Sequence, residues 1–354
     1  MFDVLLIVVT FLISLFGTAI MCRYAAYMGL VSSPNKRSSH KLPTPVGGGV
    51  PLVCAFLFSV LLLFIHRDLA DKEFIILIGG GLIIASVSFL DDLRSVPVLW
   101  RLLLHFFSVT AGVLLTGGLP PVQTGYLFLD LSWYGSVIII FFLVWWLNLF
   151  NFMDGIDGIA GVETVSVVLS AVFIIHFCKQ KTDTDVLLLI LLMASVLGFL
   201  WYNWPPARIF MGDTGSTFTG YSLGMIALIT NEKGLLSLWI WFILFSVFLV
   251  DATMTLLIRI VRGENIFKAH RNHAYQHIAL LLAKNRGISG EKTRARAHLT
   301  VITGVAAINM FWLLPCAFFA ALRPEWGGVI FGMAILPLVC CRVGLSIISH
   351  KQSI

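Results

Sequence analysis

The amino-acid sequence predicts an all-α, polytopic integral membrane protein that forms a single transmembrane domain over residues 1–354. Hydrophobic residues make up 58% of the chain and charged residues only 12%, whereas charged residues are about a quarter of an average soluble domain. The apolar residues lie in long continuous runs, as membrane-spanning helices require, and do not alternate with polar residues as in a membrane barrel. This composition excludes soluble, disordered and disulfide-scaffold proteins.

Eleven segments have the length and composition of a membrane-spanning helix. In chain order they cover about 3–22, 47–65, 74–90, 98–116, 133–150, 159–178, 186–202, 216–230, 235–260, 299–321 and 327–349. The segment 216–230 is the weakest because it carries Thr and Gly, so ten spans are the alternative. The glycines 47–49 precede no Gly-Lys-Ser/Thr, and they indicate close helix packing rather than a phosphate-binding loop.

The basic residues orient these segments. With the N-terminus outside, 18 of the 24 Lys and Arg residues fall on the cytoplasmic side, as the positive-inside rule requires. The sequence therefore predicts a cytoplasmic C-terminus and a cytoplasmic active face formed by the loops at about 23–46, 91–97, 150–158, 203–215 and 261–298. The net charge of +6 is explained by these loops, and we expect no nucleic-acid partner.

Polar residues at the ends of membrane spans are costly and indicate function. Asp91 and Asp92 end the third predicted span, and such a pair suits metal binding, proton abstraction or both, against the simpler interpretation of a solvated helix end. Arg101 follows nine residues later and could hold a phosphate at the same membrane face.

A second cluster follows the fifth span in the run N-L-F-N-F-M-D-G-I-D-G. Its polar residues recur every third position, and the glycines between them allow the helix to open there. Three such steps drift by about 180° on an ideal helix, so only neighbouring pairs can adjoin. The sequence therefore predicts a polar cup at a helix end, formed by Asn148, Asn151, Asp154 and Asp157.

Two further clusters lie in the cytoplasmic loops. The segment N-W-P-P-A-R-I-F-M-G-D-T-G-S is a shaped loop because its two prolines exclude a helix, and Thr214 and Ser216 can cap the span that follows. Its candidate residues are Asn203, Arg208, Phe210 and Asp213. In the long basic loop, the spacing i, i+3 and i+7 predicts one helical face that carries His270, His273 and His277. Zinc is an alternative there, but no H-E-x-x-H motif supports it. Asp251 lies inside the ninth span, where we expect an internal partner.

Carboxylates, amides and basic residues at one membrane face suit magnesium-assisted phosphoryl transfer, in which positioning and charge neutralisation carry the catalysis. A site at the membrane edge favours a lipid phosphate as the acceptor.

The sequence also resembles a known family. The segments S-S-P-N-K-R-S-S-H-K-L-P-T-P-V-G-G-G, D-D-L-R-S-V-P, N-F-M-D-G-I-D-G-I-A-G, F-M-G-D-T-G-S and H-R-N-H are similar to motifs of the polyprenyl-phosphate N-acetylhexosamine-1-phosphate transferases, which are glycosyltransferases of family 4. The last motif resembles the branch that initiates O-antigen synthesis and differs from the three consecutive histidines of the related phospho-MurNAc-pentapeptide transferase.

This resemblance implies transfer of a sugar 1-phosphate from a UDP-N-acetyl sugar to undecaprenyl phosphate with release of UMP. It also implies Mg²⁺ as the cofactor, with Mn²⁺ as a substitute, a homodimer, and a place in the bacterial inner membrane. The sugar is left open between GlcNAc and 6-deoxy sugars such as FucNAc or QuiNAc.

Matched motif by motif, the resemblance implies individual roles. Asp213 and Asn151 would bind the metal, and Asp91 and Asp92 would face the lipid phosphate, one of them as a base. Asp157 and Phe210 would hold the uracil, and His270 and His273 would contact the sugar-diphosphate end. Further substrate contacts are expected from Arg101, Asn148, Asp154 and Asn203.

Two departures and three alternatives accompany this interpretation. Val46 stands where many relatives have Arg, and Ser32 or Ser33 stands where they have Asp, so no ligand role is assigned to the first loop. The alternatives are an intramembrane prenyltransferase, a CDP-alcohol phosphotransferase and a transporter or flippase. The second expects D-G-x-x-A-R, which does not follow Asp154; the third would release no UMP.

Overall fold

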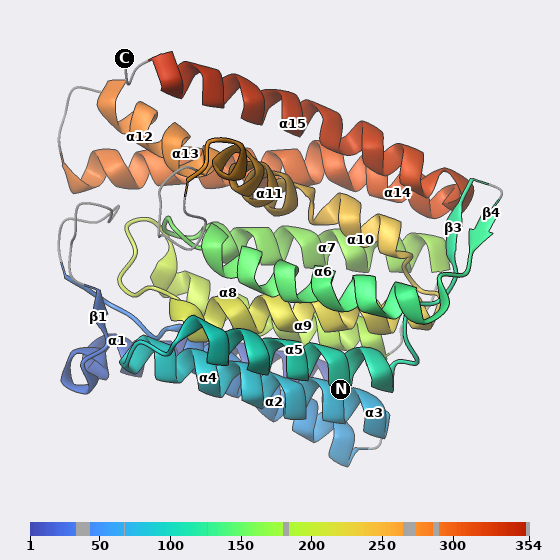
Figure 1. Cartoon of the computed structure of the whole chain (residues 1–354). Coiled ribbons are helices and arrows are strands. Elements are labelled where there is room, and N and C mark those ends of the chain that lie inside the picture. Colours follow the sequence, from blue (N-terminus) through green and yellow to red (C-terminus); the bar gives the residue numbers. More distant parts are fainter. Residues whose placement is uncertain are drawn as a thin grey trace.

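A computed structural model (Figure 1) describes residues 1–32, 43–66, 68–125, 127–179, 184–264, 273–285 and 290–351. Most helices run side by side along one common direction and form a bundle. The strands of the described residues form two short antiparallel pairs. In one, β1 (Val31–Ser32) pairs with β2 (Thr44–Pro45), and in the other β3 (Val122–Thr124) pairs with β4 (Leu127–Leu129). The predicted all-α class is confirmed.

All eleven predicted segments fall on helices. In chain order the α-helices are α1 (Phe2–Tyr24), α2 (Gly49–Ile65), α3 (Asp71–Phe74), α4 (Gly81–Leu93), α5 (Val98–Leu115), α6 (Ser132–Met153), α7 (Ile159–Lys179), α8 (Thr184–Asn203), α9 (Gly212–Glu232), α10 (Leu238–Leu244), α11 (Ser246–Val261), α12 (Ala274–Asn285), α13 (Glu291–Ile308), α14 (Leu314–Leu322) and α15 (Gly327–Lys351). The π-helical segment η2 (Ile75–Gly80) joins α3 to α4, and the π-helical segment η3 (Asn309–Leu313) joins α13 to α14. A short 3₁₀ turn, η1 (Ala25–Met28), follows α1, and another, η4 (Pro324–Trp326), precedes α15.

Not every helix is long and apolar enough to cross a membrane by itself. Among the described residues, eight helices are long and apolar enough to cross a membrane. There is a ninth such span if the bent pair of α10 and α11 counts as one. The range 235–260, predicted as one span, is bent by 74° between these two helices. The break between α10 and α11 falls at Phe245, whose backbone stays in the right-handed helical region. The next residue, Ser246, donates its hydroxyl back to the Phe242 carbonyl at 2.8 Å, a contact that favours bending.

Helix α1 has the polarity of a lipid-exposed helix. Its buried positions recur every fourth residue and include Thr10, Ser14 and Thr18, while large apolar side chains such as Phe16 and Ile20 are exposed. The Ser14 hydroxyl donates to the Ser195 carbonyl of α8 at 2.5 Å. Because lipid replaces water around the bundle, the apolar face points outward and small polar residues join the helices.

Helix α9, the weakest predicted span, is the central helix. Every residue from Thr214 to Thr230 is buried, so α9 is surrounded by other helices and not by lipid. Hydropathy, which measures how well a helix tolerates lipid, therefore ranks this segment too low as a membrane span. Its first turn lies against α2, where a Cβ on Gly49 would come within 2.3 Å of the Gly215 Cα. The close packing predicted for the glycines 47–49 is confirmed.

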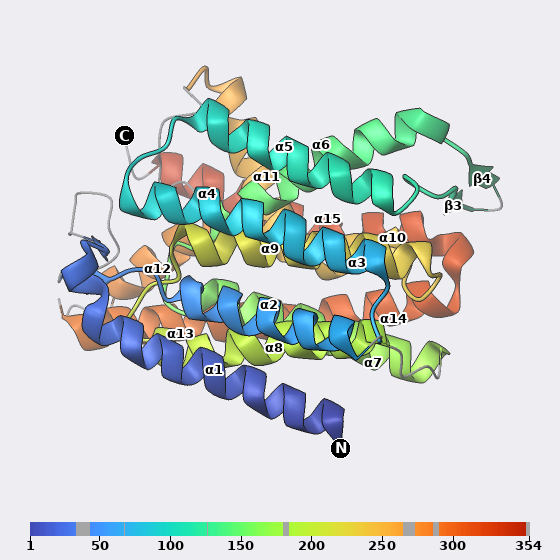
Figure 2. The same ribbon diagram turned by 90° about the horizontal axis from the view of Figure 1, so that it is seen from below.

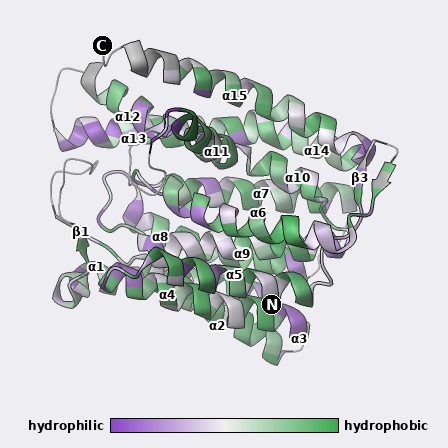
Figure 3. Ribbon diagram, in the orientation of Figure 1, coloured by the Kyte–Doolittle hydropathy of each residue, from purple (hydrophilic) through white to green (hydrophobic). Residues whose placement is uncertain are grey.

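The two ends of the bundle differ. Hydrophilic residues gather at the end where α13 begins (Figure 3), which is also where α4 and α6 end and α9 begins. The start of α1 and the end of α15 lie toward opposite ends of the bundle (Figures 1 and 2). The side that each end faces in the cell stays a prediction.

Candidate active site

The two adjacent acidic residues at the end of α4 meet the beginning of α9. Asp92 accepts the backbone N–H groups of Asp213 at 2.9 Å and Thr214 at 3.0 Å, and the Thr214 hydroxyl at 2.6 Å. A carboxylate at a helix N-terminus is favoured by the free amides and the helix dipole. The sequence-based expectation that Thr214 and Ser216 cap this helix was wrong, because Asp92 supplies the cap and the Ser216 hydroxyl donates to the Gly212 carbonyl.

Gly212 is the residue that permits this approach. Its φ angle is +77°, and a Cβ at this position would lie 2.8 Å from the Asp92 Oδ2 atom. A larger residue would be strained by its backbone and would displace the carboxylate. The glycine of the F-M-G-D-T-G-S motif therefore brings Asp92 and Asp213 together.

Asp91 and Arg101 form the next part of the cluster. One Asp91 oxygen accepts the Val96 N–H at 2.7 Å, and the other forms an ion pair with Arg101 in the first turn of α5. The same guanidinium nitrogen lies 3.4 Å from Asp213 Oδ2. The side chains of Arg101 and Asp213 are 30% and 40% exposed, so both can be reached by a substrate.

The end of α6 brings one of its two asparagines to this cluster. The Asn151 amide donates to the Ser216 hydroxyl at 2.9 Å, and its side chain also interacts with the Asp213 carboxylate. The Asn148 amide instead donates to the Val144 carbonyl at 2.7 Å and lies 3.3 Å from a ring nitrogen of His105 on α5. Of these two amides, the structure therefore places Asn151 beside the acidic cluster.

The helix opens after Asn151, as the glycines predict. Helix α6 ends at Met153 and α7 begins at Ile159, so Asp154 lies in the segment between them. Burial raises the pKa of Asp154 to about 7, and the negative charges of Asp213, Asp157 and Asp92 add to the shift. This carboxyl group is therefore partly protonated at neutral pH.

Asp157 is held inside the fold by groups from two other segments. Its Oδ2 atom accepts the Ala207 N–H at 3.2 Å and lies 3.2 Å from the His298 Nδ1 atom of α13. Burial opposes ionisation, but the hydrogen bond and charge of His298 and the Ala207 N–H outweigh it and lower the pKa of Asp157. No spacing in the sequence indicated His298, which lies 141 positions away.

Asn203 joins the same two loops. Its carbonyl oxygen accepts the Gly158 N–H at 2.8 Å, and its amide donates to the Ile209 carbonyl at 2.9 Å. Phe210 follows, and its backbone bonds to Pro45 and Gly48 at 2.9 and 3.0 Å, next to a parallel bridge between Val46 and Phe210. The end of the first loop thus supports the Phe210 segment through its backbone.

The histidine cluster is described only in part. His270 lies outside the described residues. His273 is buried, with its Nδ1 atom 3.9 Å from the Asp251 Oδ1 atom. Burial lowers the pKa of His273, and the charges of Arg342 and Arg259 act in the same direction against that of Asp251. His273 directly precedes α12, and its carbonyl accepts the His277 N–H at 3.1 Å. With His270 outside the described residues, the common face of the three histidines stays a prediction.

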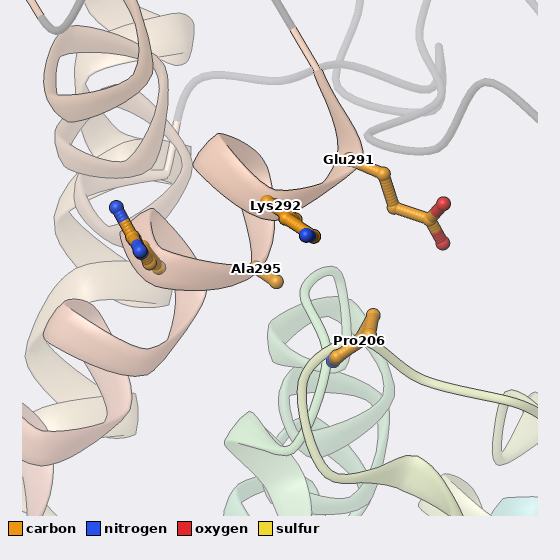
Figure 4. Close-up of a pocket in the computed structure, with 5 residues that line it drawn as sticks. Pro206, Glu291, Lys292 and Ala295 are labelled. Atoms are coloured by element: carbon orange, nitrogen blue, oxygen red, sulfur yellow. The ribbon is translucent and has the colours of Figure 1, made fainter.

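A pocket of about 530 Å³ lies between the loop before α9 and the first turns of α13 (Figure 4). Lys292 and Arg296 give it positive charge, and Glu291 stands at its edge. Its Pro206 wall directly precedes Ala207, which binds Asp157. Among the described residues, no three His, Cys, Asp or Glu side chains are grouped so that they could hold a metal ion by themselves.

Comparison with known proteins identifies similar sequences. Residues 74–231 match glycosyl transferase family 4. The probable undecaprenyl-phosphate N-acetylglucosaminyl 1-phosphate transferase of Bacillus subtilis is 30% identical over 283 residues, which cover 77% of this chain and 77% of that protein. The phospho-N-acetylmuramoyl-pentapeptide-transferase of Thermotoga neapolitana is 30% identical over 324 residues, 87% of this chain and 97% of that protein. The protein of the same name from Listeria welshimeri is 26% identical over 261 residues, 66% and 75% of the two chains.

Proposed function

Because this chain belongs to glycosyl transferase family 4, we propose that it transfers an N-acetylhexosamine 1-phosphate from a UDP-sugar to undecaprenyl phosphate and releases UMP. Its relatives indicate a polyprenyl-phosphate sugar-1-phosphate transferase embedded in a membrane. The identity of the sugar, the metal and the roles of single residues are our proposal. The observation that carries it is the cluster of Asp91, Arg101 and Asp213 beside Asn151 and Asp154.

The surroundings of Arg101 support a lipid acceptor. Arg101 lies in the first turn of α5, and the neighbouring Leu99, Trp100 and Leu103 are all exposed large hydrophobic residues. A polyprenyl chain can lie along this apolar surface while its phosphate meets the guanidinium group, which binds phosphate in a planar, two-pronged geometry. Asp91 would hold Arg101 in place for this contact.

The donor set near Asp213 fits Mg²⁺. Mg²⁺ prefers oxygen ligands and is commonly bound by one or two carboxylates together with substrate phosphates. The Asp213 carboxylate is partly exposed, and Asn151 lies beside it, so these two residues would hold the ion, with Mn²⁺ as a substitute. When bound, the ion would neutralise the diphosphate of the UDP-sugar and stabilise the departing UMP. Asp92 would fix Asp213 by holding the first turn of α9.

We assign the UDP-sugar to the side of Asp157 and Phe210. The two residues lie on segments that Asn203 ties together, and an aromatic ring and a carboxylate can stack on uracil and accept its imide N–H. The positively charged pocket borders the same loop and would attract the anionic UDP-sugar. His273, with His270, would act at the sugar-diphosphate end. Asn148 and Asp154 are proposed to complete the polar surroundings of the substrates.

We place this reaction on the cytoplasmic side of a bacterial inner membrane, because UDP-sugars are made in the cytoplasm. The product would be an undecaprenyl-diphosphate-linked sugar, the first lipid intermediate of O-antigen or a related cell-envelope polysaccharide. The printed name of the Bacillus subtilis relative supports GlcNAc as the first sugar to be tested.

The test is release of UMP by the purified protein in detergent, with undecaprenyl phosphate and Mg²⁺. UDP-GlcNAc, UDP-FucNAc and UDP-QuiNAc are offered separately, with and without the lipid phosphate and with EDTA. The proposal requires UMP release that depends on lipid, sugar nucleotide and metal. Release of CMP from a CDP-alcohol, or substrate movement without any nucleotide product, would instead support the alternative classes.

A further inference from the structure

The beginning of α12 lies directly on the segment that carries Asn151, Asp154 and Asp157. The Tyr275 hydroxyl donates to the Phe152 carbonyl at 3.2 Å. A Cβ on Gly155 would lie 2.1 Å from that hydroxyl and 2.8 Å from the Gln276 amide nitrogen. The position of the first turn of α12 and the position of the acidic segment therefore depend on each other.

A carboxylate from α11 holds this first turn. Asp251 is 7% exposed, and its two oxygens accept the backbone N–H groups of Ala274 at 2.8 Å and Tyr275 at 3.3 Å. This is the arrangement of a helix cap, in which a charged acceptor stabilises free amides at the N-terminus. His273, directly before the helix, lies beside the same carboxylate.

The buried charge of Asp251 is compensated by α15. The Arg342 Nε atom donates to Asp251 Oδ1 at 3.1 Å, and its Nη2 atom donates to the Thr255 hydroxyl at 2.9 Å. Arg342 is 5% exposed, and a buried carboxylate without such a partner would be strongly unfavourable. The expected internal partner of Asp251 is thus present, and α11, α12 and α15 meet at the site end of the bundle (Figure 1).

We propose that Asp251 and Arg342 are positioning residues for sugar-phosphate transfer. By fixing the first turn of α12 they place His273 and, through Tyr275, the segment that carries Asp154. The inference rests on the proposed function only for its kinetic readout. Neither residue is assigned to contact a substrate. A displacement of about 1 Å at a reacting group can lower a rate by about 10²-fold, so a distant pair can control turnover in this way.

The chain contains a matched control pair at the other end of α9. Lys233 lies 2.9 Å from Asp185 Oδ1 and 2.5 Å from Glu73 Oε1, and Asp185 is almost fully buried. Helix α9 has 21 residues, so this pair lies about 30 Å from the candidate site. Asp185→Asn therefore weakens the ion pair of another buried carboxylate without touching the first turn of α12.

The experiment compares Asp251→Asn, Arg342→Gln, the double variant and Asp185→Asn. The first two should lower kcat/KM for the UDP-sugar on the order of 10–100-fold, and the double variant should be no worse than the more severe single one, because the pair acts as a unit. Affinity for UMP should change less than twofold. Asp185→Asn should lower Tm and leave kcat/KM within twofold. Tyr275→Phe, which removes a single hydroxyl, serves as the test variant if the buried-pair variants do not fold. It should lower kcat/KM in the same direction by a smaller factor.

Hydrogen exchange provides a readout that does not depend on activity. Peptides that cover residues 274–285 and 151–158 should exchange at least about tenfold faster in Arg342→Gln and Tyr275→Phe than in the unchanged protein, and at the unchanged rate in Asp185→Asn. If the unchanged protein releases no UMP, the proposed function fails. The hydrogen-exchange rates then still test whether Asp251 and Arg342 hold the first turn of α12. Unchanged exchange in both peptides, or folded Asp251 and Arg342 variants with kcat/KM within twofold, would overturn this inference.

Discussion

Replacing Asp213 with Asn should abolish sugar-phosphate transfer while leaving the protein folded. The Asp213 side chain is 40% exposed, and its ion-pair contact with Arg101 is 3.4 Å long. Exposed ion pairs contribute about 0–1 kcal/mol to stability, so Tm should fall by no more than about 4 °C. A group that stabilises charge in a transition state is typically worth about 10²–10³-fold in rate, and we expect at least this loss.

The adjacent control is Asp92→Asn, which should lose both stability and activity. Asp92 accepts three hydrogen bonds at the start of α9, and an amide keeps one acceptor oxygen while turning an NH₂ group toward the other donors. Hydrogen bonds to charged groups contribute about 1.5–3 kcal/mol each. Loss of one or two of them should destabilise the protein by about 2–5 kcal/mol and displace Asp213.

The assay measures initial UMP release and thermal unfolding on the same preparations in detergent. Asp213→Asn should fall far in rate with little change in Tm, and Asp92→Asn should fall in both. Near-normal turnover in Asp213→Asn would remove this carboxylate from the centre of the mechanism. An Asp92→Asn protein with unchanged Tm would show that the three hydrogen bonds do not hold the helix start.

Three further predictions follow from the site. Asp157→Ala and Phe210→Ala should weaken the binding of UMP and of every UDP-sugar alike, with the lost stacking in Phe210→Ala worth roughly 1–3 kcal/mol. His273→Ala should lower turnover of the UDP-sugar more than affinity for UMP. Equal losses of affinity in a binding series would contradict this division. Arg101→Ala should raise KM for undecaprenyl phosphate at least about tenfold and leave KM for the UDP-sugar within twofold, measured by varying each substrate in turn. Because the pKa of Asp154 is raised from 3.8 to about 7, the contribution of this group to the stability of the folded state is lost as the pH rises from about 4 to about 7. Asp154→Asn should remove this contribution from the dependence of Tm on pH, and an identical pH profile would contradict the assigned shift.

Local composition predicted the helices because lipid imposes a length and an apolar character on each crossing. It ranked α9 lowest for a physical reason. Hydropathy measures how well a helix tolerates lipid, and α9 is buried by other helices from Thr214 to Thr230. Its Thr, Ser and Gly residues allow close contact with α2, as at Gly215, and such contacts depend on neighbours that no local window contains.

The candidate site was predictable where motifs meet at helix ends. Asp92, Asn151 and Asp213 gather as expected because the ends of α4 and α6 and the start of α9 lie at one end of the bundle. The partners of the buried charges were not predictable. His298 and Arg342 lie in helices that a hydropathy pattern places but does not pair, and these contacts span 141 and 91 positions.

The surroundings of the acidic residues separate positioning from chemistry. Asp92 is bound to the start of α9, Asp157 to Ala207 and His298, and Asp251 to the start of α12 and Arg342. Both oxygens of Asp92 and of Asp251 accept helix N–H groups, which leaves little capacity for a substrate, and removal of their partners is expected to disturb the fold first. Asp213 is partly exposed, with Arg101 3.4 Å away, and Asp154 is repelled by the negative charges of three other carboxylates. A bound cation would relieve this repulsion at the point where the phosphates must meet. We therefore expect the chemistry at Asp213 and Asp154, positioning at Asp92 and Asp251, and uracil recognition at Asp157.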